Sequence, residues 1–192
     1  MTSQVSTDAQ TSDGIGAAPL AALAILAGAA VAVLVGVYGQ VHDPTGEATI
    51  TLFFTGTLHF KAWAATLVLV FALFQAFSAL WMYGRLGWAV PSWLGPVHRL
   101  SGTLALLISL PVVYHCLWSL GFETEADETR RFLHSLFGCV VYGAFTTKIL
   151  AVRLHGMPKW LLPSVGGLLF AALIGVWCTS SLWFFQNIGF EI

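Results

Sequence analysis

The chain has 192 residues, of which 57% are hydrophobic and only 9% are charged, where about a quarter is usual in soluble domains. With a mean hydropathy of +0.81, this composition excludes a disordered chain, a fibrous repeat and a typical soluble enzyme, and it indicates a membrane protein. The net charge of −1 provides no basic field for nucleic acid, so we expect the lipid bilayer as partner and no nucleic acid.

Residues 1–16 are polar and small and contain no Lys or Arg, which predicts a disordered tail and not a cleaved signal peptide. Five apolar segments follow, each long enough to cross a bilayer as a helix. They cover roughly residues 17–38, 60–82, 97–120, 132–152 and 161–185. We therefore predict an all-α, polytopic membrane helical bundle with five transmembrane helices, forming one domain over residues 17–187.

The basic residues near the segment ends predict an orientation, because cytoplasmic loops carry the excess of Lys and Arg. The side that includes the N-terminus holds Arg85, Arg99, Lys148, Arg153 and Lys159. The opposite side holds Lys61, Arg130 and Arg131, which four acidic residues dilute. We expect a multi-pass protein of the bacterial cytoplasmic membrane, with its N-terminus inside and its C-terminus outside.

The three cysteines, Cys116, Cys139 and Cys178, all lie in apolar segments, and the sequence contains no CxxC or CxxCH. This pattern argues against a disulfide framework, a zinc ribbon and a c-type haem attachment. We interpret all three as small apolar packing residues.

The six histidines are the main functional candidates. His42 lies beside Asp43 in a polar loop and is interpreted as a surface residue. The other five lie in or at the ends of apolar segments, where ionisable side chains are costly and therefore point to function: His59, His98, His115, His134 and His155. The alternative for each of them is a structural hydrogen-bonding or interfacial role.

The third and fourth segments are joined by about eleven residues, so we expect antiparallel neighbours. In such a pair, His115 lies at the height of His134, and His98 at the height of His155. Two facing imidazoles are the axial ligands that a b-type haem uses. We predict one b haem at the first pair, near the outer face, and leave open a second at the other pair. The second is harder to place, because residues 17 apart differ by about 100° in direction on a straight helix, unless Pro111 twists it.

Arginines accompany both pairs. Arg130 and Arg131 precede His134, and Arg99 follows His98. Each could hold a haem propionate through charge-assisted hydrogen bonds. Each is equally explained as an anchor at the membrane surface.

His59 begins the second apolar segment on the outer side and is the rival axial ligand there. Its alternative is an interfacial hydrogen-bonding residue. Glycines within the fourth and fifth segments allow either close helix contact or space for a flat cofactor, and we expect packing. They are Gly138, Gly143, Gly166 and Gly167.

The segments VHRLSGTLALL around His98 and FLHSLFGCVVYGAFTTK around His134 resemble the diheme b-type cytochromes of the ferric-reductase and bacterial membrane cytochrome b kind. That resemblance implies two b haems that pass electrons across the membrane, held by His98, His115, His134 and His155. The wider pattern, with YHCLWSLGF and SLWFF, resembles an uncharacterised bacterial family of small five-helix membrane proteins over residues 17–187.

Three functions compete on the sequence alone. The first is a membrane b-type haem electron-transfer protein, or the haem-bearing subunit of a larger oxidoreductase, with quinol or a redox partner subunit supplying electrons. The second is a non-redox accessory or assembly subunit, whose histidines only pack. The third is a small transporter or metal-ion carrier, against which stands the lack of Asp or Glu inside the apolar segments.

Overall fold

The structure is a computed structural model that describes residues 16–47, 50–123 and 128–190. Within these ranges the fold is all-helical, and the predicted fold class is confirmed. Five long helices dominate the described part of the chain: α1 (Ala17–Val41), α2 (Thr57–Met82), α3 (Leu94–Tyr114), α4 (Thr129–Arg153) and α5 (Leu161–Trp177). Two wide π-helical turns, η1 (His115–Ser119) and η3 (Cys178–Leu182), extend α3 and α5, and the short α6 (Trp183–Asn187) follows η3. The expected disordered tail lies outside the described residues, apart from Gly16.

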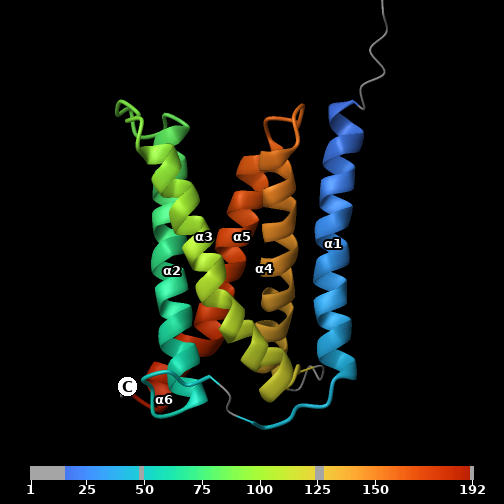
Figure 1. Cartoon of the computed structure of the whole chain (residues 1–192), viewed down its shortest axis with the longest axis vertical. Coiled ribbons are helices and arrows are strands. Elements are labelled where there is room, and N and C mark those ends of the chain that lie inside the picture. Colours follow the sequence, from blue (N-terminus) through green and yellow to red (C-terminus); the bar gives the residue numbers. More distant parts are fainter. Residues whose placement is uncertain (1–15, 48–49, 124–127, 191–192) are drawn as a thin grey trace, which may run out of the picture.

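The five helices run alternately up and down and are long and apolar enough to cross a membrane (Figure 1). The candidate spans in the described residues are 17–41, 57–82, 94–119, 129–153 and 161–187. The protein is therefore a multi-pass membrane protein, as predicted. Each predicted span is recovered to within about three residues, because an apolar run must satisfy its backbone groups as a helix in lipid.

The third span changes its helical geometry a few residues after Pro111. The helix continues past it but widens into η1, where the Leu120 N–H donates to the His115 carbonyl at 3.0 Å. Pro cannot donate a backbone hydrogen bond and crowds the preceding turn, so the ladder shifts register here. Turns of this kind occur frequently at functional sites.

The helices pack in the order α1–α4–α5–α2–α3, and α3 leans on α2 as it crosses the bundle (Figure 1). The expectation that the third and fourth helices pack directly together is therefore wrong. They meet through a few side chains, such as Tyr142 and Ser109, because a short connection brings helix ends together without fixing the packing above them. The space between them becomes the cavity described below.

Helices α1 and α4 approach closely at two glycines. A Cβ atom on Gly28 would lie 2.5 Å from the Gly143 carbonyl oxygen, and the Thr147 hydroxyl donates to the Ala24 carbonyl at 3.2 Å. Small residues and interhelical hydrogen bonds of this kind hold membrane helices together. The predicted packing role is confirmed for Gly143 but not for the other glycines, whose Cβ atoms would meet nothing within 4 Å: Gly138, Gly166 and Gly167.

Candidate functional site

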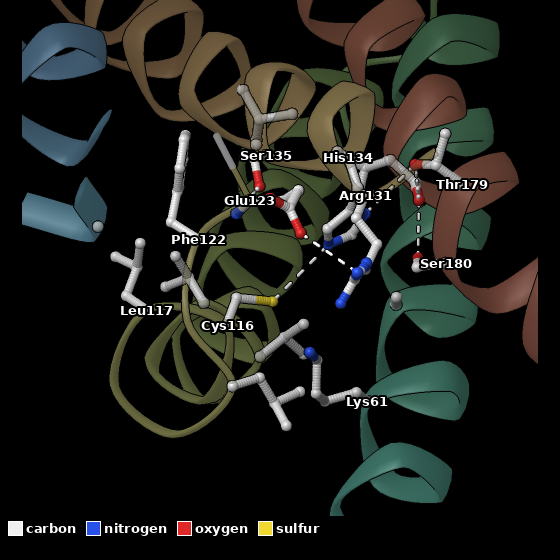
Figure 2. A pocket seen from close by; sticks show the side chains of 18 of the residues that line it. Lys61, Cys116, Leu117, Phe122, Glu123, Arg131, His134, Ser135, Thr179 and Ser180 are labelled. Atoms are coloured by element: carbon white, nitrogen blue, oxygen red, sulfur yellow. Dashed lines mark hydrogen bonds and ion pairs between the residues drawn. The ribbon is translucent and has the colours of Figure 1, made fainter. Parts of the chain in front are cut away.

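A cavity of about 580 Å³ lies among the five long helices, at the end of the bundle that carries η1 and η3. Its volume falls within the roughly 300–1,000 Å³ usual for cofactor and small-ligand sites. The walls are mostly apolar, and a few polar side chains project from four helices (Figure 2). The polar residues of the lining include Lys61, Cys116, Arg130, Arg131, His134 and Tyr142.

His134 presents one ring nitrogen to this cavity. Its Nδ1 atom lies 3.3 Å from the Thr179 hydroxyl, which itself donates to the Gly175 carbonyl at 2.7 Å. Since that hydroxyl proton is already used, Thr179 accepts from the Nδ1–H of His134. The tautomer is thereby assigned, and Nε2 carries a lone pair that faces the Cys116 sulfur at 3.8 Å across the cavity.

The same face of α4 stays open below His134. Gly138 lines the cavity one turn further along, and a Cβ atom built on it would meet nothing within 4 Å. One more turn along, the Tyr142 hydroxyl donates to the Ser109 carbonyl and hydroxyl of α3, at 3.2 and 3.1 Å. The spacing i, i+4, i+8 therefore gives a polar group, an open flat stretch and a second polar group on one helix face.

Cations surround the mouth of the cavity. Arg130 donates to a backbone carbonyl of η3 at 2.7 Å and lies over the Trp183 ring at 4.1 Å. Arg131 pairs with Glu123 at 3.4 Å, as the dashed line in Figure 2 shows. Lys61 reaches into the cavity from α2. The sequence predicts a role for Arg130 and Arg131 beside His134, and all three line the cavity.

His115 is placed differently from the prediction. It is fully buried and does not line the cavity. Its Nε2 atom lies 2.8 Å from the Ile50 carbonyl, to which it donates, and its Nδ1 atom lies 3.2 Å from the Ser119 hydroxyl. Both ring nitrogens are thus engaged, Nε2 in holding Ile50 against η1 and Nδ1 within η1 itself. The structure does not bring His115 and His134 together at one site.

The second predicted pair lies at the opposite end of the bundle. His98 is half-buried, with Nδ1 at 2.7 Å from the Ser78 hydroxyl of α2, whereas His155 and Arg99 are exposed. Beside His98, the Gln75 side chain accepts from the Lys148 ammonium at 3.2 Å. These polar groups tie α2, α3 and α4 together at this end.

Of the last two histidines, only His42 differs from expectation. His59 does not line the cavity and packs edge-on against Phe184, with ring centroids 5.0 Å apart. His42, interpreted as a surface residue, is half-buried and lies between the Tyr38 and Trp118 rings. Its Nε2 atom is buried, with no hydrogen-bond partner among the described residues. The earlier interpretation of His42 is wrong, because the loop carrying it folds back against η1.

Two functional candidates were missed from the sequence, Cys116 and Thr179. The height relation that paired His115 with His134 applies equally to Cys116, one residue further on. A cysteine in an apolar segment is usually a packing residue, so the sequence around Cys116 gives no sign of a functional role. Thr179 lies near the end of the fifth span, far from the short connection that joins this span to the fourth. No motif near Thr179 predicts that it faces His134.

The fold and cavity define the class: a helical multi-pass membrane protein with a cofactor-sized cavity at one end of its bundle. The chain belongs to a family of unknown function, DUF6529, whose model matches residues 20–192. The chain matches no curated protein and no solved structure. The resemblance to b-type cytochromes finds no support in these comparisons and stays a prediction.

Proposed function

We propose that this protein is a membrane b-type haem electron-transfer protein, acting alone or as the haem-bearing subunit of a larger oxidoreductase. The observation that carries the proposal is the His134 imidazole. Its Nε2 lone pair faces the cavity while Thr179 accepts from the opposite ring nitrogen. Histidines that bind metals almost always donate their second N–H in this way, which fixes the ring and raises its basicity.

The shape and charge of the cavity suit a flat, largely apolar cofactor that carries acidic groups. Gly138 leaves the wall beside His134 free of side chains, and apolar residues of the five long helices surround the space. Arg130 and Lys61 provide positive charge at the cavity for propionate groups. His134 would then bind the haem iron, Thr179 would orient its ring, and one haem is the expected content.

A bound haem would supply the one-electron chemistry, which cofactors and not ordinary side chains carry. The protein binds it, excludes water with the apolar wall and holds its acidic groups near the membrane surface. Quinol in the bilayer or a redox partner subunit is the proposed source of electrons. No step here requires a nucleotide cofactor.

The proposed orientation puts this cavity near the outer face of a bacterial cytoplasmic membrane, with the N-terminus inside. Five basic residues at the opposite end support it through the bias of cytoplasmic loops. An impermeant maleimide should label Glu128→Cys in intact cells, whereas Lys159→Cys should react only after lysis. Labelling of Lys159→Cys in intact cells, with Glu128→Cys protected, would reverse the orientation.

The function is tested by absorption spectra of protein purified from haem-replete cells. Wild type should show a Soret band and the sharp bands of a low-spin b haem after reduction. His134→Ala should lose this spectrum or become high-spin, and His155→Ala, exposed at the other end, should keep it. A colourless wild type contradicts the proposal and favours the accessory-subunit alternative. An unaltered spectrum in His134→Ala contradicts the assigned ligand.

A further inference from the structure

The cavity wall that faces the His134 Nε2 atom carries a thiol. Cys116 lies in η1, the wide turn that follows Pro111, and its sulfur points into the cavity toward His134 (Figure 2). The Sγ to Nε2 distance is 3.8 Å. In this turn, the His115 side chain faces the 50s segment and the next side chain faces the cavity.

The surroundings of this sulfur differ from those of the other two cysteines. The Lys61 ammonium interacts with it from α2, and His134 approaches it from α4 (Figure 2). Positive neighbours stabilise a thiolate, the form of cysteine that binds metals. Cys178, by contrast, is exposed on the outer surface of the helix bundle, and Cys139 is buried where α1 and α4 pack.

On the basis of the proposed function, we propose that the Cys116 thiolate is the second axial ligand of the haem iron, opposite His134. First-row metals take imidazole nitrogen at about 2.0 Å and thiolate sulfur at about 2.3 Å, as zinc does, so a trans pair stands about 4.3 Å apart. At 3.8 Å, the Sγ and Nε2 atoms are within about half an ångström of the separation that ligation of one iron requires, and the macrocycle would take up the space of the cavity around them. Neither atom has to leave its helix.

Ligation forms an iron–sulfur bond and breaks the S–H bond of Cys116. The proton leaves through the mouth of the cavity to water, as it does when metals bind cysteine. The Lys61 ammonium then balances the charge of the thiolate. No oxidant or reductant is consumed, since the iron keeps its oxidation state in this step.

A thiolate pushes electron density onto iron and so distinguishes this haem from the bis-imidazole haems that the sequence resemblance implies. The ferric protein should be low-spin with a narrower spread of electron paramagnetic resonance g values than a bis-imidazole haem gives. Its reduction potential should also lie lower, because the axial ligand identity sets the potential.

The test compares ferric wild type with Cys116→Ala and with the matched control Cys178→Ser. The thiolate signal should be present in wild type, absent from Cys116→Ala with haem still bound, and unchanged in Cys178→Ser. A membrane-permeant maleimide should label Cys116 in haem-free protein and be excluded in the loaded protein. The wild-type spectrum alone decides the matter even where the Cys116→Ala variant does not fold.

The two proposals fail in different ways. A wild type without any Soret band overturns the haem function and this ligand together. A wild type with a Soret band but an imidazole-only signal, which Cys116→Ala leaves unaltered, overturns the thiolate ligand and leaves the haem function standing.

Discussion

Replacing Thr179 with Val tests how the structure prepares His134. Valine keeps the shape of threonine but removes the hydroxyl that accepts from the Nδ1–H at 3.3 Å. The ring then either keeps an unsatisfied buried N–H or turns away from the iron. The cost of leaving a buried donor unsatisfied is about 1–3 kcal/mol.

The hydrogen bond is long, so the lower part of that range applies, about 1–2 kcal/mol. Since about 1.4 kcal/mol corresponds to a tenfold change in affinity, haem binding to Thr179→Val should weaken roughly 5- to 30-fold. This range overlaps the roughly 10- to 100-fold effect of losing an outer partner of a metal-binding histidine.

The assay is a titration of haem into haem-free protein in detergent, followed by the Soret band. Thr146→Val is the matched control, because its hydroxyl also donates to the carbonyl four residues earlier, that of Tyr142, at 2.9 Å. It should bind haem like wild type. Equal affinities for Thr179→Val and wild type would refute the assigned tautomer and the orienting role of Thr179.

Three further outcomes follow from the packing. Gly28→Ala should lower the unfolding free energy in detergent by about 1–3 kcal/mol, the usual cost of overpacking, because its Cβ meets a backbone carbonyl at 2.5 Å; Gly36→Ala, whose Cβ has an ordinary 3.5 Å contact, should not. Gly138→Leu should reduce bound haem by filling the cavity, whereas Gly166→Leu should leave haem content unchanged. His115→Ala should destabilise the fold, measured by thermal unfolding, but any folded fraction should keep the low-spin haem spectrum.

The five spans could be predicted from the sequence because length and apolarity alone decide whether a segment crosses a bilayer as a helix. A proline removes a donor from the ladder and can twist a helix, but the sequence did not predict the wide turn at His115–Ser119 that follows Pro111. The packing partners were not predicted either. A short connection suggested that α3 lies beside α4. Instead α3 packs on α2, where the Gln75 side chain of α2 donates to the Ser101 hydroxyl and the His98 carbonyl of α3.

The site was predicted only in part, for a physical reason. Position along a helix predicts height, and this put His134, Arg130 and Arg131 correctly at one end. Direction around a helix depends on its turn type and neighbours, and the wide η1 turn shifts which side chain faces the cavity. His115 therefore faces the segment at Ile50. Cys116 faces His134 instead, in the place that was expected for His115.

The most direct test of the central claim is the ratio of haem to protein in the purified wild type. It can be measured as pyridine haemochrome against quantitative amino-acid analysis. One cavity in which His134 and Cys116 face each other predicts one b haem per chain. A ratio of two would show that the His98 end holds a second haem, and a ratio of zero would contradict electron transfer through this protein.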